Sequence, residues 1–246
     1  MKQPKKVISL VPSLTELLID LGLRENLVGR TRFCIHPEEA VRDIPIIGGT
    51  KNPNLDKIRE SNPEIIIANK EENRKEDIDE LSSGFRIYLT DISSVEEALI
   101  TIIEIGEIFD VKNKAKKLVD SILAQLELSP DEPVKSVAYF IWRNPWMVAG
   151  GDTYINSVLS HYKLRNIYSD KLRYPKVNHS ESAKRNPDYI FLSSEPYPFK
   201  EKHIEEVEKK CNKSKVILTN GEWFSWYGSR MLPSFKELNL FRKAIG

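Results

Sequence analysis

Aromatic residues and arginines are concentrated in two short segments, each of which follows an expected strand. The segments are 142–146 and 222–228, and together they contain all 4 tryptophans of the chain. Loops in such positions line the binding crevices of α/β sheets. Rings on loops, with arginines between them, suit a flat or ring-shaped organic ligand that carries anionic groups. We therefore expect ligand contacts from Arg143, Trp146, Trp226 and Arg230.

Further loop residues could join this set. Phe33 follows the second expected strand, and Tyr174 lies in the 170–178 connection. Three more arginines occur in the same segments, namely Arg30, Arg32 and Arg173. The alternative is that some of these rings only cover the edges of the fold, and the residue pattern leaves both interpretations open.

The sequence offers no pattern of residues typical of catalysis. Catalysis requires a nucleophile with a base, paired carboxylates or a metal site. The 4 histidines have no spacing of the HxH or HExxH type, so surface or capping roles explain them. The glycine pairs at 48–49 and 150–151 lack a phosphate-binding fingerprint and predict tight turns. Ser13 is better explained as a helix cap than as a nucleophile, since no G-x-S-x-G motif is present. We therefore expect no catalytic residue, no metal site and no enzyme.

The composition is that of an ordinary globular protein. The 37 basic and 36 acidic residues give a net charge of +1, which provides no bulk attraction to nucleic acid or to an anionic membrane. Cys34 and Cys211 lie far apart without metal-site spacing and predict free thiols. The first residues lack the apolar stretch of a secretory signal. Either the protein stays in the cytoplasm, or a leader was removed and it works in the periplasm or at a membrane surface.

Strand-length apolar runs alternate with helical periods along the chain, which is the pattern of an α/β fold with largely parallel sheets. Ser13 is expected to cap the first helix and Gly22 to end it. The segment 111–128 contains no Gly or Pro and predicts one long amphipathic helix. Strands are expected at 6–11, 27–31, 44–47, 64–69, 85–90, 135–142, 189–193 and 215–219. The other helices are expected at 54–61, 74–82, 94–109, 152–162, 180–186, 200–211 and 230–244.

A repeated sequence motif predicts two similar halves. The motif Asn62-Pro63-Glu64 before an apolar strand returns as Asn186-Pro187-Asp188 before another. Asn-Pro pairs commonly end helices, so the alternative to duplication is that two such helix ends occur by chance. We expect an N-terminal α/β lobe at 1–110, a bridging helix at 111–129 and a C-terminal α/β lobe at 130–246. A stiff helix between the lobes predicts small closures only.

The order of motifs resembles a known family. Segments 7–17, 27–31, 47–49, 54–58 and 62–66 look like the class III substrate-binding proteins of ABC importers, in the cobalamin and iron-siderophore group. The similarity covers nearly the whole chain. The resemblance implies two α/β lobes joined by a backbone helix, with a non-covalently bound ligand in the cleft between them.

The resemblance also implies roles for single residues. Phe33 stands where cobalamin-binding members have a cleft tyrosine, and Tyr174 stands where they have a cleft tryptophan. Trp146 falls near a cleft phenylalanine.

The late part of the chain carries a further motif of these members, and the early part departs from their pattern. In the motif Glu222-Trp223-Phe224, Glu222 replaces an aspartate and Trp223 is kept. Thr50 occupies the place of a tryptophan that stacks on the ligand. The expected ligand is therefore cobalamin, another corrinoid or a ferric siderophore, with haem as a further option.

Members of the family dock on an ABC permease through one acidic residue in each lobe, and Asp56 and Glu181 match those positions. Without the resemblance, either carboxylate would be interpreted as a solvated charge at the start of a helix. We expect a monomeric substrate-binding component that captures a small-molecule metal chelate and delivers it to a permease. The alternative is a cytoplasmic protein or enzyme that handles corrinoids or metal chelates on the same scaffold.

Overall fold

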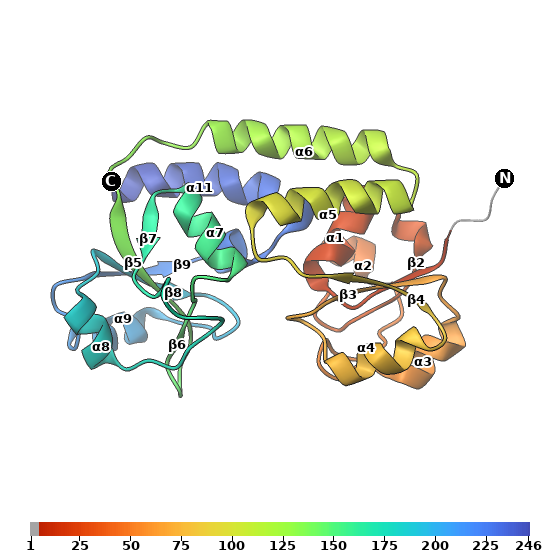
Figure 1. The fold of residues 1–246 in the computed structure, drawn as a ribbon, viewed down its shortest axis with the longest axis horizontal. Coiled ribbons are helices and arrows are strands. Elements are labelled where there is room, and N and C mark those ends of the chain that lie inside the picture. The colour runs from red at the N-terminus through yellow and green to blue at the C-terminus, as the bar shows by residue number, and fades with distance from the viewer. Residues whose placement is uncertain (1–4) are drawn as a thin grey trace. The chain divides into compact units, whose positions relative to one another are not determined.

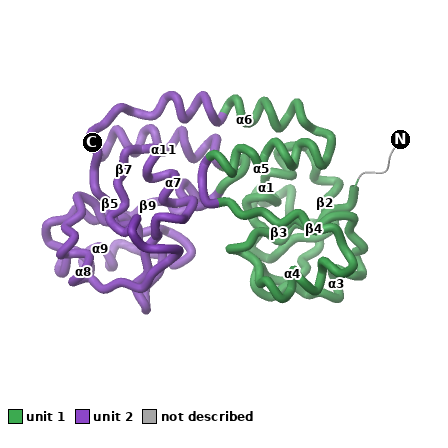
Figure 2. The backbone as a smooth tube through the Cα atoms, viewed as in Figure 1, with its two compact units in different colours: residues 1–92, 96–121, 227–230 green, residues 93–95, 122–226, 231–246 purple. Residues whose placement is uncertain are grey.

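The computed structural model describes residues 5–246, and the chain forms two compact units (Figure 2). Unit 1 consists of the residues up to 92 together with 96–121 and 227–230, and unit 2 consists of 93–95, 122–226 and 231–246. Both units are α/β, as the alternation of apolar patterns predicted. None of the helices within residues 5–246 combines the length and apolar character that a membrane crossing requires.

Unit 1 contains a parallel sheet with the strand order β2-β1-β3-β4. The central strands are apolar and fully buried because helices cover both faces of the sheet (Figure 1). The strands are β1 Val7–Ser9, β2 Leu27–Arg30, β3 Ile65–Asn69 and β4 Arg86–Thr90. The helices of this part of the chain are α1 Pro12–Asp20, α2 Glu38–Val41, α3 Leu55–Ser61, α4 Lys75–Ser82, α5 Val95–Ile108 and α6 Lys112–Glu127.

In unit 1, the alternating direction of side chains along each strand decides which helices a strand residue contacts. Ile8 and Ile66 pack with Ile58 of α3 and with Ile78 and Leu81 of α4 in one buried cluster. Successive residues of a strand point to opposite faces, so their neighbours in β1 and β3 face the other layer of helices. Figure 1 shows α3 and α4 on one side of this sheet and α1 and α5 on the other.

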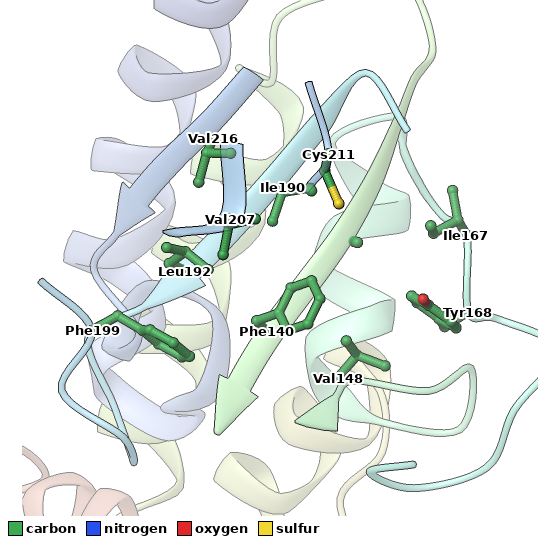
Figure 3. Close-up of a cluster of buried hydrophobic side chains, with 11 residues drawn as sticks. Phe140, Val148, Ile167, Tyr168, Ile190, Leu192, Phe199, Val207, Cys211 and Val216 are labelled. Atoms are coloured by element: carbon green, nitrogen blue, oxygen red, sulfur yellow. The ribbon is translucent and has the colours of Figure 1, made fainter. Parts of the chain in front are cut away.

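Unit 2 contains a second sheet with the order β6-β5-β8-β9, and β7 also pairs with β5. All pairings are parallel except that of β5 with β6. The strands are β5 Lys135–Trp142, β6 Met147–Val148, β7 Leu164–Asn166, β8 Tyr189–Ser193 and β9 Lys215–Thr219. The helices are α7 Tyr154–His161, α8 His179–Arg185, α9 Glu201–Glu208, α10 Glu222–Ser225 and α11 Met231–Ile245. A buried cluster that includes Phe140, Ile190, Phe199 and Val207 joins β5, β8 and α9 (Figure 3).

Two expectations about local structure in unit 1 are wrong. Segment 44–47 forms only an isolated bridge between Arg30 and Ile46. Pro45 has no N–H to continue a ladder, and Gly48 turns the chain with φ 115°. Ser13 is not the cap of α1, because Pro12 begins the helix and Val11 takes the cap position without a side-chain bond. Proline is favoured at this first helical position, since its missing N–H would have no helical partner.

The repeated Asn-Pro motif has the same local structure in both units. Asn62 ends α3 with φ 44° and Asn186 ends α8 with φ 47°, both in the left-handed region that Asn tolerates. The acidic residue after each proline then holds the start of the neighbouring strand. Glu64 Oε1 accepts a bond from the backbone N of Lys6 at 3.1 Å, and Asp188 Oδ2 accepts one from the backbone N of Ser136 at 2.6 Å. The repeated motif therefore has the same structural role in both units, ending a helix and fixing the start of a strand.

Candidate functional site

In unit 2, aromatic residues gather after the carboxyl ends of three neighbouring parallel strands. Trp142 ends β5 and Trp146 follows it, Tyr197 follows β8, and Trp223 follows β9. Because β5, β8 and β9 are adjacent and parallel, their carboxyl ends share one edge of the sheet. This is the edge at which open α/β sheets bind their ligands. Trp142 is 39% exposed and lies edge-on to Tyr197, with 5.8 Å between ring centroids.

Trp146 is half-buried and packs against the buried cluster of unit 2. Its ring stacks on Phe199 at a centroid distance of 5.7 Å and lies edge-on to Phe140 at 5.6 Å, two members of the cluster in Figure 3. His179 is closer, at 4.4 Å. One part of the Trp146 ring is therefore packed against the core, and the other part is accessible to a ligand.

Arg143 is bound within unit 2. Its guanidinium pairs with the carboxylate of Glu206 on α9, with Nε–Oε2 at 3.2 Å and a second nitrogen at 3.3 Å from Oε1. The guanidinium carbon also lies 5.8 Å from the ring of Trp146. A bidentate pair fixes the orientation of the arginine and balances its charge.

Tyr174 lies on a loop that two glycines hold close to the sheet. The backbone N of Gly150 donates to the carbonyl of Arg173 at 2.7 Å, and that of Gly151 donates to Lys171 at 2.8 Å. A Cβ at Gly151 would lie 2.1 Å from the carbonyl oxygen of Ser169, so this position admits no side chain without movement of the backbone. Gly150 and Gly151 were expected to form a tight turn. In the structure they let their backbone lie close to the backbone of residues 169–173.

Glu195 connects the segments that follow β8 and β9. Its Oε1 accepts bonds from the hydroxyl of Ser225 at 2.6 Å and from Nε1 of Trp226 at 2.8 Å. Trp226 therefore has a fixed ring orientation. Sequence reasoning missed Glu195, although a glutamate two residues after an expected strand, at the edge shared with the tryptophans, was an available signal.

Glu222 and Trp223 begin α10. The backbone N of Glu222 donates to Asn220 Oδ1 at 3.0 Å, which fixes the start of this short helix. The ring of Trp223 is half-buried and lies 6.1 Å from that of Phe241 on α11. Trp223 is thus partly held by α11 and partly accessible.

In unit 1, Phe33 follows the carboxyl end of β2 and is 52% exposed. Thr50 is 9% exposed, and its backbone carbonyl accepts a bond from Asn73 Nδ2 at 3.1 Å. Thr50 is therefore largely buried beneath this surface and offers little of its side chain to a ligand. The two residues differ in their access to a ligand although both were predicted to touch one.

Arg230 is bound to Glu16 of α1 within unit 1. The shortest N–O distance is 2.7 Å, and the carboxylate is only 10% exposed. Burial raises the pKa of Glu16, while the bond to Arg230 acts in the opposite direction. Gly228, at φ 88°, lets this segment lie against α1, because a Cβ there would meet Leu17 and the carbonyl of Ser13 at 3.3 Å.

Both predicted docking acids lie in the first turn of a short helix and pair with an arginine of the same helix. Asp56 is 2.9 Å from Arg59, which also bonds to Glu80. Glu181 is 3.2 Å from Arg185, which also bonds to Asp170 at 2.8 Å. The side chain of Asp56 is 85% exposed and that of Glu181 is 36% exposed, so both are accessible to a partner.

The histidines have no common centre. His203 Nδ1 accepts from the backbone N of Lys200 at 2.9 Å, as a helix cap, and His161 Nε2 lies 2.8 Å from the hydroxyl of Ser129. His179 is buried, and burial lowers its pKa. Residues 5–246 contain no group of three His, Cys, Asp or Glu side chains that could hold a metal ion.

Comparison with known proteins gives consistent matches along the chain. Residues 7–220 match the family model described as periplasmic binding protein. A vitamin B12-binding protein of Photorhabdus laumondii is 26% identical over 241 residues, which cover 96% of this chain and 86% of that protein. The ABC transporter substrate-binding lipoprotein YvrC of Bacillus subtilis is 30% identical over 202 residues, which cover 77% of this chain and 63% of that protein. The apo structure of the periplasmic heme-binding protein RhuT from Roseiflexus sp. RS-1 superposes with a TM-score of 0.80 at 17% identity and covers 99% of this chain and 100% of that one.

Proposed function

The chain belongs to the periplasmic binding protein family, and from this premise we propose that it is the substrate-binding component of an ABC importer that captures a metal chelate. Its ligand is a corrinoid or an iron chelate, either haem or a ferric siderophore. The protein releases this ligand unchanged to a permease, and no covalent step takes place. It works outside the cytoplasmic membrane, in the periplasm or at the membrane surface.

One observation carries the ligand class. Exposed or half-buried aromatic rings follow the carboxyl ends of β5 and β9 in unit 2 and of β2 in unit 1. Aromatic faces bind flat conjugated rings through large contact areas with little loss of conformational freedom. The relatives named for vitamin B12 and for heme support the same class, since both ligands are macrocycles with a central metal.

The ligand can be identified by titration with a small panel. Purified protein is mixed with cyanocobalamin, dicyanocobinamide, haemin or a ferric hydroxamate, and binding is measured by calorimetry and by tryptophan emission. We expect at least one Kd below about 100 μM, which corresponds to about −5.5 kcal/mol. All 4 tryptophans lie in the segments expected to touch the ligand, so emission reports on the site directly. Absence of binding across the whole panel would contradict the proposed function.

Delivery to a permease is proposed to use Asp56 and Glu181. Each is an accessible carboxylate in a helical first turn, where an arginine of a partner can reach it. Replacing both with lysine should abolish uptake of labelled ligand by cells that depend on this protein, while the Kd of the purified protein stays unchanged. The exposed Asp120 on α6 provides the control, because Asp120→Lys makes elsewhere the same change of charge as each of the two single substitutions. Normal uptake by the double variant would rule out docking through these residues.

A further inference from the structure

The surface after β2 in unit 1 contains an arginine next to the exposed ring of Phe33. The guanidinium carbon of Arg32 lies 6.0 Å from the centroid of that ring. Both side chains approach the backbone of Gly49, since a Cβ there would lie 3.3 Å from Phe33 Cε2 and 3.5 Å from Arg32 Nε. Asn52 Oδ1 is closer still, at 2.3 Å from the same point. Three side chains with ring, cationic and amide chemistry therefore meet over one glycine.

The charge of Arg32 is not balanced by a carboxylate. Arg32 is exposed and takes part in no ion pair in the described part of the chain. The four other arginines of the candidate loops are already engaged. Arg30 donates to the carbonyls of Val41, Thr31 and Cys34, Arg143 pairs with Glu206, Arg173 pairs with Asp152, and Arg230 pairs with Glu16.

We propose that Arg32 recognises an anionic group at the edge of the ligand and so selects among metal chelates, a role that rests on the proposed function. Phe33 offers a ring face for the macrocycle, and the guanidinium beside it offers paired donors that match a carboxylate or a phosphate. Arg143 and Arg230, the arginines predicted from the sequence to bind the ligand, have their charge balanced within the protein. Of the five arginines in the candidate loops, the one without a partner carboxylate or carbonyl among the described residues is therefore on the unit 1 surface.

The test uses pairs of probes that differ in an anionic group. Haemin carries two propionates that are esterified in haemin dimethyl ester, and cyanocobalamin carries a phosphodiester that dicyanocobinamide lacks. Each Kd is measured by calorimetry for the wild type, Arg32→Gln, Arg32→Lys and Arg86→Gln. Arg86 is the matched control, because it is also exposed but begins β4, at the amino end of the opposite edge strand.

For the pair that binds, we expect Arg32→Gln to weaken the anionic member about tenfold or more and to leave the other member unchanged. Arg32→Lys should restore part of the loss, since it keeps the charge without the planar fork. Arg86→Gln should change neither Kd. If Arg32→Gln lowers both affinities equally or leaves the preference intact, Arg32 does not have this role, whereas the proposed function stands. If the wild type binds no member of either pair, Arg32 does not have this role, and if it does not bind the ferric hydroxamate either, the proposed function fails as well.

Discussion

The carboxylate of Asp188 accepts two hydrogen bonds from Ser136, one from the backbone N and one from the hydroxyl, both at 2.6 Å. The hydroxyl also lies 2.9 Å from the backbone N of Asp188. These bonds join the chain before β8 to the start of β5, the two central strands of the unit 2 sheet. They lower the pKa of Asp188, the side-chain bond more than the backbone bond.

Asp188→Asn should lower the free energy of unfolding by about 1 kcal/mol at pH 7, a modest value because the residue is exposed and solvent screens its interactions. A carboxylate whose folded pKa is depressed contributes stability above its unfolded pKa and loses it as pH falls. The difference between wild type and variant should therefore shrink below about pH 4. Urea denaturation across pH measures it, with Glu64→Gln as the control at the corresponding place in unit 1. A difference that stays constant with pH would contradict this role of the ionised form.

Arg230→Met leaves the carboxylate of Glu16 buried without its cation. Removing one partner of a buried pair costs about 3 kcal/mol. The pKa of Glu16, already raised by burial, should rise further. A raised pKa means that stability is complete below the unfolded value, about 4.3, and is lost as pH rises.

The deficit of Arg230→Met should therefore be larger at pH 7 than at pH 4, which urea denaturation followed by circular dichroism can measure. Arg173→Met is the control, because the Arg173–Asp152 pair is more exposed and should contribute less than about 1 kcal/mol. A deficit that grows on acidification would overturn this account of Glu16.

Glu195→Ala removes the acceptor that orients the ring of Trp226. If Trp226 contacts the ligand, the looser ring should weaken binding by about 1 kcal/mol, measured by calorimetry. Glu195→Gln keeps an oxygen that can accept both bonds and should restore most of the affinity. In a Trp226→Phe background the ring has no N–H to orient, so Glu195→Ala should cause no further loss. An equal loss in both backgrounds would mean that Glu195 acts by another route.

Trp146→Ala should weaken ligand binding by about 1 to 3 kcal/mol and also destabilise unit 2, since the ring stacks on Phe199. Trp142→Ala provides the comparison, because Trp142 is more exposed and contacts Tyr197, a partly buried residue beside the cluster, only at an edge. It should affect binding more than stability. Calorimetry and urea denaturation of both variants separate the two effects. Unchanged affinity in Trp146→Ala would show that the ring serves only the core.

Gly151→Ala should destabilise the protein by about 1 to 3 kcal/mol, because the new methyl group meets the backbone carbonyl of Ser169 and no side-chain rotation can relieve the clash. Gly84→Ala is a matched control, since nothing lies within 4 Å of the added carbon. It should be neutral or slightly stabilising, because alanine restricts the unfolded chain. Thermal unfolding of both variants gives the comparison, and equal effects would contradict the steric explanation.

The elements of the fold could be predicted well where one physical signal dominates. Strands 135–142, 189–193 and 215–219 are observed at those residues, because buried parallel strands consist of continuous apolar runs. The 111–128 pattern likewise became the single helix α6. Short elements such as β6 and α10 were missed, since their positions depend on contacts with distant loops and not on periodicity.

The residue types of the candidate site could be predicted from the sequence, but the partners of its arginines could not. The tryptophan segments identify the edge at which ligand contacts are expected, whereas the partners of the arginines arise from residues far away in the chain. Glu206 lies 63 positions from Arg143, and Glu16 lies 214 positions from Arg230. No local pattern shows which arginine keeps an unbalanced charge.

The location of all 4 tryptophans in unit 2 affects how unfolding can be followed. Indole emission follows the melting of one unit, whereas far-ultraviolet dichroism averages the helices of both. If the units melt together, the two signals will have the same midpoint. If they melt separately, the emission curve isolates unit 2, and the remaining change in ellipticity reports the unfolding of the unit that contains Phe33 and Arg32.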